Sequence, residues 1–527
     1  MKEGKAGVLS NRAAGALVVL YFFAIAVLLL SQAMNGADHD EDVYMLGARF
    51  FAGHAIYKDY LYLQPPYHAV LLGSVYQLST DLFGICKRPC YFLEARLLNW
   101  LVALGVMTVF YLLLRTMFER GVAIVCCTLL AFNPGFYAAS GVVRNDLLPL
   151  LLSLLALFVL FRPVETGTSR MGRALVAGIC VALAVGTKLN YIHMPPALFL
   201  FLALWPPQLT FAERLCRQVI PFSIGVLIGF APIALLAARD PAAFYFGVFG
   251  FHASPPAEWL AEHLPGYTPL QTFWRVLIRP LTSVLVSLVF LLALLIGLDR
   301  SGGRPVAYFY RNGQWLFFFV LVAATLVGFL PSPSYIWYFM PAAPFLILCF
   351  VSLWSYPMRK GLAQPVTLVI FVMLASLIPA FVTMASRSIP HLTSPSKWQP
   401  VIVHAVSARV DKILNKANVR GKIATLSPSK IIDSRRNFYL ELATAWGLFP
   451  RAAFMLDDEV RRLHGASPAT LTAILEADMP AAIFGGYESD DVFLFAFAKA
   501  HGYRRVRHKA LEHGILFVRR PQVSTGP

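Results

Sequence analysis

The sequence has few charged residues for its length. Charged residues make up 14% of its 527 positions, whereas hydrophobic residues make up 58%. A soluble globular domain typically has about 25% charged residues. Long apolar runs account for the difference, so the composition excludes a soluble protein and indicates a polytopic membrane protein.

Cysteines and internal repeats are also scarce. Five of the seven cysteines lie in or beside apolar runs, where cysteine behaves as a small hydrophobic residue. Cys86 and Cys90 flank a short basic segment and permit a local disulfide, but no zinc-site spacing occurs. The sequence shows no internal repeat, which argues against a transporter built from repeated halves.

Acidic residues are fewer than basic ones, 28 against 45, and the net charge is +17. The basic residues punctuate the gaps between apolar runs and form no single stripe. This distribution is typical of membrane topology signals and argues against a nucleic-acid partner.

The apolar runs predict about eleven membrane spans, within a range of about ten to thirteen. Their expected positions are 14–33, 97–114, 121–139, 146–161, 174–188, 190–205, 218–238, 281–298, 314–331, 335–354 and 364–384. Basic residues fill alternate gaps from the N-terminus onward, which predicts a cytoplasmic N-terminus. This pattern requires residues 66–85 to form an interfacial or re-entrant helix, because a crossing there would invert every later span.

The character of the chain changes after the last predicted span. Residues 385–527 mix charged and apolar positions and contain strand-like runs, "GKIATLS", "AAIFGGY" and "GILFVRR". The predicted fold class is therefore an α-helical polytopic membrane protein with a small C-terminal α/β external domain. Residues 1–384 form the transmembrane domain, with external loops at 34–96 and 239–280.

Carboxylates gather directly after the first span, in "GADHDEDVYMLGARFFAG". The helical pattern of residues 41–53 places Asp40 and Glu41 at the start of a short helix, where capping alone is one explanation. The cluster is larger than a cap needs.

Further charged residues are predicted on the same side of the membrane. Arg144 and Asp146 open the fourth span, and Lys188 ends the fifth. Each alone is explained by anchoring at the membrane boundary. Together they indicate acid–base chemistry on an anionic, lipid-linked substrate.

Several motifs follow one another in a familiar order: the acidic pair, "YKDYLYLQPPY", "RNDLL", "GICVALAVGTK" and "YIWYFMPAAP". In these the chain resembles the GT-C superfamily of integral-membrane glycosyltransferases. The resemblance is particularly to bacterial relatives of protein O-mannosyltransferases and of the lipid A aminoarabinose transferase. The resemblance covers roughly residues 14–360 and extends to a C-terminal external domain.

The resemblance implies transfer of a sugar from a polyprenyl-phosphate donor, with inversion, to an envelope glycan, lipid or protein. The reaction would take place at the external face of a bacterial inner membrane, with the C-terminal domain in the periplasm. The implied catalytic residues are Asp40 as general base, its neighbour Glu41, and Asp146, which would orient the acceptor or bind a cation.

Two further groups of residues complete the predicted site. Those expected at the donor phosphate are Lys188, Arg144, Lys58 and Gln64; those expected elsewhere in the pocket are Tyr57, Tyr62, His193, Tyr335 and Tyr338. Gln64 stands where several relatives have a lysine before the Pro-Pro pair, and an amide supplies no charge.

The sequence does not decide whether a cofactor is used, and it allows two alternative functions. GT-C relatives include metal-free and metal-assisted enzymes, so the expectation is either no cofactor or a divalent cation at Asp40 and Asp146. The nearest alternative function is an oligosaccharyl transferase that uses a lipid-pyrophosphate donor. A non-catalytic membrane scaffold or transporter is the other.

Overall fold

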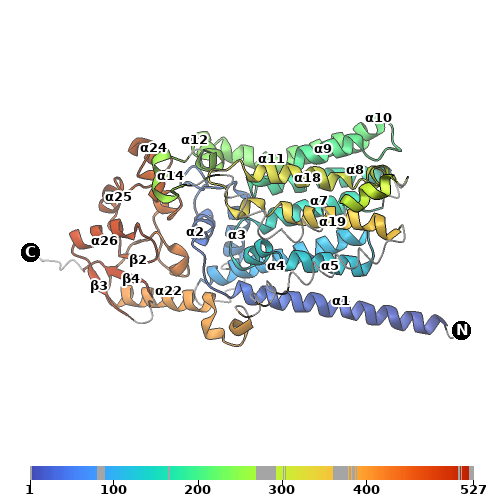
Figure 1. Cartoon of the computed structure of the whole chain (residues 1–527). Coiled ribbons are helices and arrows are strands. Elements are labelled where there is room, and N and C mark those ends of the chain that lie inside the picture. Colours follow the sequence, from blue (N-terminus) through green and yellow to red (C-terminus); the bar gives the residue numbers. More distant parts are fainter. Residues whose placement is uncertain are drawn as a thin grey trace, which may run out of the picture.

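The computed structural model describes residues 3–79, 89–163, 167–253, 255–266, 292–300, 304–359, 389–508 and 513–520, with a few isolated residues between these ranges. It is mostly helical. A bundle of long helices occupies one side of the molecule and carries the N-terminus at its far end, and a smaller region with a β-sheet occupies the other (Figure 1).

The bundle helices are α1 (Glu3–Ala33), α4 (Tyr91–Arg115), α5 (Arg120–Ala131), α6 (Pro134–Gly141), α7 (Leu147–Phe161), α8 (Gly167–Val185), α9 (Met194–Leu204), α10 (Phe211–Arg214), η3 (Leu215–Val219), α11 (Ile220–Ala237), α17 (Pro305–Arg311), α18 (Trp315–Gly328) and α19 (Ala342–Arg359). Most of the bundle helices coincide with predicted apolar runs, whereas α10 and α17 lie between these runs. The predicted spans at 281–298 and 364–384 lie largely outside the described residues.

Within the described residues, three helices are long and apolar enough to cross a bilayer: Gly15–Ala33, Tyr91–Arg115 and Phe211–Ala237. The span predicted at 121–139 is instead a bent pair, because α5 and α6 meet at 66°. Asn133 caps α6 and Pro134 begins it, so the break has a local cause. Shorter apolar helices make up much of the remaining bundle.

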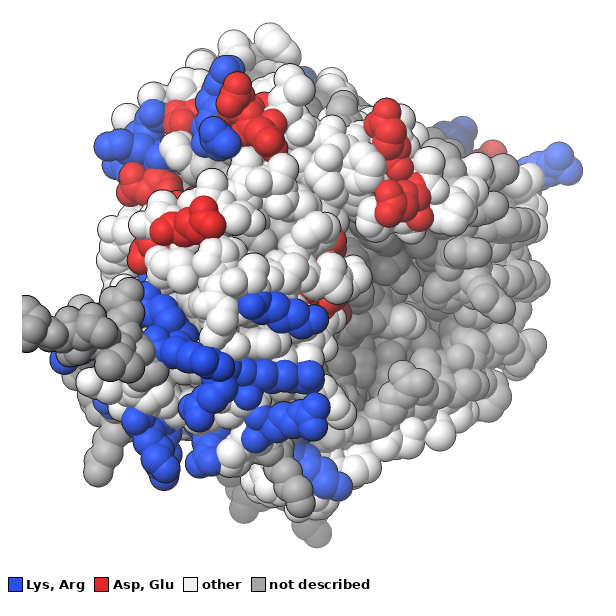
Figure 2. All heavy atoms as spheres, turned by 90° about the vertical axis from the view of Figure 1, so that its left-hand side faces the viewer, with Lys and Arg blue, Asp and Glu red and all other residues white. Residues whose placement is uncertain are grey.

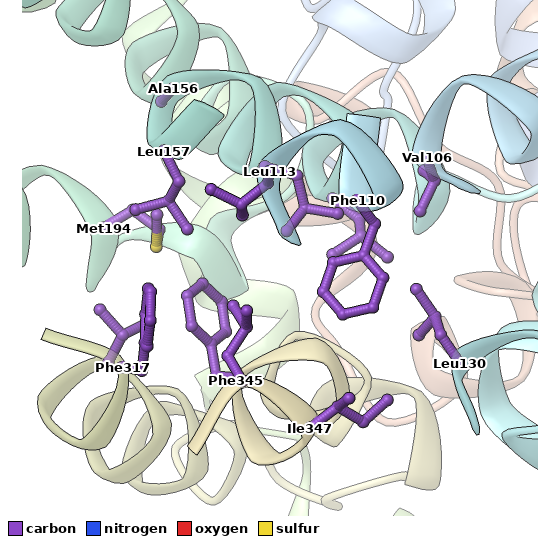
Figure 3. Packing of buried hydrophobic residues seen from close by; sticks show 14 of the residues in the cluster. Val106, Phe110, Leu113, Leu130, Ala156, Leu157, Met194, Phe317, Phe345 and Ile347 are labelled. Carbon is purple, nitrogen blue, oxygen red and sulfur yellow. The ribbon is translucent and has the colours of Figure 1, made fainter. Parts of the chain in front are cut away.

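The bundle core is formed by side chains from most of the bundle helices. Phe110 and Leu113 of α4 face Leu130, Leu157 and Phe345 of α5, α7 and α19 (Figure 3). All are fully buried. The apolar core is continuous through the bundle, as expected for helices that pack inside a membrane domain.

Two short helices, α2 (Glu41–Phe51) and α3 (Tyr67–Leu78), lie at the end of the bundle that faces the sheet (Figure 1). With 12 residues, α3 is shorter than the roughly 20 residues that a span requires. It packs against α2. These features agree with the predicted interfacial helix, although residues 80–85 of that prediction lie outside the described residues.

The C-terminal region contains a four-stranded sheet in the order β1-β2-β4-β3. Its strands are β1 (Ile423–Ala424), β2 (Ala482–Gly485), β3 (Arg504–Val506) and β4 (Ile515–Val518). The β1–β2 pair is parallel and the other pairs are antiparallel. The helices around it are α22 (Gln399–Lys416), η8 (Pro428–Ile431), α23 (Phe449–Ala452), α24 (Asp457–Arg462), α25 (Leu471–Ala477) and α26 (Asp491–Ala500). The three predicted strand runs appear as β1, β2 and β4.

The first loop and the C-terminal region share one hydrophobic core. Leu46 and Phe92 from the N-terminal part are buried in the same cluster as Val406 and Phe484. Arg49 of α2 adds three hydrogen bonds to backbone carbonyls of the C-terminal region, at 2.7, 3.0 and 2.7 Å. On the outer face of this end, a large group of Lys and Arg covers the lower half, and most Asp and Glu lie in the upper half together with a few basic residues (Figure 2).

Candidate active site

A cavity of about 260 Å³ lies where the bundle meets the C-terminal region. Its lining comes from segments spread over the whole chain: the loop before α2, the loops that hold Gln64, Arg144 and Lys188, two later loops, and α23. The charged residues among the described lining are Asp40, Arg144, Lys188 and Arg451. With three cations and one carboxylate, this lining carries a net charge of +2 when the histidines are neutral.

An alternating chain of charges forms one wall of the cavity. The Asp40 carboxylate pairs with Arg144, whose Nε donates to Asp146 Oδ2 at 2.9 Å. Lys188 pairs with the other oxygen of Asp146. Although Asp40 is the N-cap residue of α2, its side chain makes no capping hydrogen bond. Capping therefore does not account for this carboxylate.

Burial and charge together fix the ionisation of Arg144. Burial by itself would lower the pKa of the guanidinium, but Asp146 and Asp40 outweigh it and raise the pKa above its ordinary value. Arg144 is 6% exposed and Asp146 is 2% exposed. Arg144 thus remains a fixed positive charge in a largely dehydrated setting.

Aromatic rings cover the same cations. The Arg144 guanidinium carbon lies 4.4 Å from the centre of the Trp337 ring, and Lys188 Nζ lies 5.6 Å from that of Tyr338. Trp337 and Tyr338 both lie in the segment between α18 and α19, in the "YIWYF" motif. A ring face stabilises a cation without neutralising it, so both rings favour the charged forms of these side chains.

Arg451 completes the positive side of the cavity. It lies on α23, and its guanidinium stacks 4.0 Å from the Phe251 ring and 4.3 Å from the Trp259 ring. Its Nη1 donates to the Phe251 carbonyl oxygen at 2.8 Å. The sequence prediction missed this residue, because the motif "GLFPRAAF" carries no signal that links it to the first loop.

Neutral polar groups line the floor between these charges. Gln64 Oε1 accepts from Asn145 Nδ2 at 3.0 Å. His252 Nε2 lies 2.8 Å from the Leu63 carbonyl oxygen and is therefore the protonated ring nitrogen. Burial lowers the pKa of His252 to about 4, so the ring is uncharged at neutral pH.

Comparison with known proteins identifies the architecture. The family described as dolichyl-phosphate-mannose-protein mannosyltransferase matches residues 64–236. The crystal structure of ArnT from Cupriavidus metallidurans bound to undecaprenyl phosphate aligns with 98% of this chain and 100% of its own, with a TM-score of 0.60 and 16% identity. Its apo form aligns with 96% and 98%, with a TM-score of 0.62 and 15% identity.

The chain has the GT-C fold. Archaeal oligosaccharyltransferase AglB from Archaeoglobus fulgidus, in complex with an inhibitory peptide and a dolichol-phosphate, is similar over 91% of this chain and 70% of its own, with a TM-score of 0.52 and 10% identity. No curated protein sequence matches the chain. The structural likeness confirms the predicted fold class, a helical membrane protein with a small C-terminal sheet.

The fold brings six of the predicted site residues to the cavity. These are Asp40, Gln64, Arg144, Lys188, Tyr335 and Tyr338. Asp146 is not in the lining, because both its oxygens bind the basic side chains beside it.

Glu41 also lies away from the cavity. It is fully buried and forms a two-pronged ion pair with Arg96, at 2.6 Å for each oxygen. It also accepts from the Val143 backbone N–H at 2.8 Å. These contacts tie α2 to α4 and to the segment before α7. Both oxygens of Glu41 are therefore occupied by protein groups and cannot contact a substrate.

Four other predicted residues are absent from the described lining. Lys58 is exposed, Tyr57 and Tyr62 are buried in the core shared with the C-terminal region, and His193 is buried with its Nδ1 2.8 Å from the Asn190 carbonyl oxygen.

One group among the described residues has ligand atoms close enough for a metal ion: Asp38, His39 and Asp40, whose atoms lie within 4.8 Å of one another. Two carboxylates and an imidazole suit a divalent cation. The predicted partner Asp146 is not a member, since Arg144 and Lys188 engage it.

Proposed function

We propose that this GT-C chain transfers a sugar from a polyprenyl-phosphate donor to an envelope glycan, lipid or protein, with inversion at the anomeric carbon. The observation that carries the proposal is the cavity itself, in which the Asp40 carboxylate faces a space bordered by Arg144, Lys188 and Arg451. A base beside an excess of positive charge suits an uncharged nucleophile and an anionic leaving group.

Asp40 is the proposed general base. A hydroxyl is a weak nucleophile, and a carboxylate that takes its proton during attack typically contributes about 10²–10⁴-fold to the rate. The ion pair with Arg144 holds the Asp40 carboxylate in place at the cavity wall. The other oxygen, Oδ1, lies 3.5 Å from His39 Nε2.

The cations are proposed to bind the donor phosphate. When the glycosidic bond breaks, the phosphate gains negative charge, so fixed cations stabilise the transition state more than the intact donor. Asp146 is then a positioning residue, since it holds both Arg144 and Lys188. Undecaprenyl phosphate is bound in the similar ArnT structure, which supports the same class of lipid carrier here.

A divalent cation is compatible with this site but not required by its geometry. Asp38, His39 and Asp40 would hold it, and it would add positive charge beside the base. The chain's own cations already supply positive charge to the cavity, and one of them, Arg144, pairs directly with Asp40.

We place the N-terminus in the cytoplasm and residues 385–527 in the periplasm of a bacterial inner membrane. Arg115 ends α4, Arg120 begins α5 and Arg162 follows α7, and these helix ends lie at the end of the bundle away from the sheet, which supports this orientation (Figure 1).

The decisive experiment compares sugar transfer in membranes that contain wild type, Asp40→Asn or Asp59→Asn at equal protein levels. Asp59 lies in the same external loop but outside the cavity lining. With a pool of radiolabelled polyprenyl-phosphate sugars, Asp40→Asn is expected to lose transfer yet bind donor, and Asp59→Asn to retain both. Full activity of Asp40→Asn would overturn its role.

The donor class is tested in the same membranes. Lipid-monophosphate sugars should support transfer, and lipid-pyrophosphate sugars should not. The reverse result would make the chain an oligosaccharyl transferase instead.

A further inference from the structure

A second cavity lies at the opposite end of the bundle, away from the candidate active site. Its volume is about 320 Å³, and its lining comes from the end of α7, the start of α8, the segment after α9 and the helix η3. Among its residues are Arg162, Arg170, Arg173, Trp205 and Gln218. Neither the reaction proposed above nor the comparisons assign it a role.

The cavity gathers like charges at a cost. Arg170 interacts unfavourably with Arg173 and Arg217 and favourably with Glu213. Glu213 is itself paired with Arg217, at 3.7 Å. Among the described residues around the cavity, positive charge therefore exceeds negative charge, and a bound anion would relieve the repulsion.

The walls of the cavity are held in place by packing and hydrogen bonds. Trp205 stacks on Phe201 with ring centres 5.0 Å apart and on Phe161 at 6.0 Å. Gln218 Nε2 donates to the Trp205 carbonyl oxygen at 3.3 Å, and Arg173 Nη1 donates to the Arg162 carbonyl oxygen at 2.6 Å. Arg170 and Arg173 are half-buried, unlike Arg115, an exposed arginine at the same end of the bundle.

Exposed apolar side chains lie on α8, part of which lines the cavity, and on α11, which continues from η3. Val176 on α8 and Ile220 and Ile224 on α11 are 42%, 46% and 46% exposed. Phe211, at the start of α10, is 64% exposed. In a bilayer these side chains face acyl chains, so a ligand of the cavity can extend onto them.

We propose that this cavity binds the phosphate of an anionic phospholipid from the leaflet at this end of the bundle. The headgroup phosphate lies among the guanidiniums of Arg170 and Arg173, whose planar donors match phosphate oxygens two at a time. The acyl chains lie along α8 and α11. Tryptophan at the rim is typical of residues at the headgroup level.

Native mass spectrometry of the purified full-length protein, with phosphatidylglycerol or phosphatidylcholine added, tests the proposal. Phosphatidylglycerol is expected to bind and phosphatidylcholine to bind far less. Because each basic residue near a lipid headgroup contributes about 1 kcal/mol, Arg170→Gln with Arg173→Gln should weaken phosphatidylglycerol binding roughly 30-fold. Arg115→Gln with Arg120→Gln removes the same charge from the same end, outside the cavity, and should leave binding unchanged.

Loss of positive charge can also disturb insertion, so a second double variant keeps the charge. Arg170→Lys with Arg173→Lys preserves the topology signal but loses the two-pronged geometry, and should bind with intermediate affinity. Equal binding of the two lipids, or equal loss in both glutamine pairs, would overturn the proposal. Displacement of the lipid by millimolar inorganic phosphate would show that the cavity binds free phosphate and would overturn the lipid assignment.

Discussion

At the scale of single residues, three consecutive carboxylates at the start of α2 have three different surroundings. Asp40 faces the cavity, Glu41 is enclosed with Arg96, and Asp42 is buried against the C-terminal region. Successive residues of a helix point about 100° apart, so neighbours in sequence meet different partners. Their substitution should therefore have different consequences.

Glu41→Gln is expected to destabilise the fold. Removing one member of a buried ion pair leaves the Arg96 charge uncompensated and typically costs about 3–5 kcal/mol. The melting temperature in detergent, measured as the loss of the monodisperse peak in size-exclusion chromatography after heating, should fall well below that of wild type and of Asp40→Asn. A variant that is as stable as wild type but has no transfer activity would make Glu41 the reacting carboxylate.

Arg451→Ala is expected to weaken donor use without unfolding the protein. A hydrogen bond to a charged group is worth about 1.5–3 kcal/mol, which corresponds to roughly a 10- to 100-fold rise in the KM for the donor. Arg461→Ala, at an exposed position on α24, is the matched control. An unchanged KM in Arg451→Ala would remove this residue from the donor site.

The sequence pointed to several charged residues that line the cavity, but it did not show which neighbouring carboxylate faces the cavity and which is enclosed elsewhere. Asp40, Arg144 and Lys188 stand out because charges at apolar boundaries are costly and therefore informative. Arg451 does not, because it lies in a region of ordinary globular composition where an arginine carries no such signal. Glu41 could be separated from Asp40 only through its partner Arg96, which lies on another helix.

At the scale of elements, the contact between α2 and the C-terminal region predicts a dependence on pH. Asp42 Oδ1 accepts from the Ser429 backbone N–H at 2.6 Å, and burial raises the pKa of Asp42 from 3.8 to about 8. The folded state thus prefers the protonated acid more than the unfolded state does. The contribution of protonated Asp42 to the free energy of unfolding is fully present below about pH 4. It is lost as the pH rises through about 8.

Melting temperatures measured from pH 5 to 8.5 check this dependence. Wild type should become less stable as the pH rises, whereas Asp42→Asn, which stays neutral, should show a flatter profile. Burial also raises the pKa of Glu488, to about 7, so a weaker slope of the same sign should remain. Asp59→Asn should keep the wild-type slope; identical slopes in all three proteins would contradict the assignment.

The packing of α8 against α11 depends on two glycines. A Cβ added to Gly178 would overlap the Phe222 carbonyl oxygen, and one added to Gly225 would overlap that of Leu175. Gly178→Ala must therefore push the helices apart and should cost about 1–3 kcal/mol. Gly172→Ala, on the same helix with nothing within 4 Å, should leave the melting temperature unchanged. Equal effects of the two would refute a close-packed interface.

Helices were predictable where hydrophobicity alone decides them. The apolar runs at 97–114 and 218–238 coincide with α4 and α11. The break between α5 and α6 was missed because a continuous apolar run was counted as one span, although the Asn-Pro pair at its centre is a turn signal.

At the scale of the whole molecule, the shared core means that the transmembrane domain depends on the C-terminal region for its stability. A chain that ends before Gln399 would expose the apolar side chains of α2 and α3 that pack in this core. Such a chain is expected to be degraded or to aggregate, as judged by its yield and by limited proteolysis. A truncated chain that is monodisperse in detergent and resists proteolysis would show instead that residues 385–527 form an independent domain.

The shared core also sets an order of events during synthesis. Arg49 and its partner Ile432 are 383 residues apart. At roughly 5–20 residues per second, the first loop leaves the ribosome about 20–80 seconds before the chain that covers it. Until then the bilayer or a chaperone must shield its apolar surface. The candidate active site cannot be complete earlier either, because Trp446 and Arg451 line it.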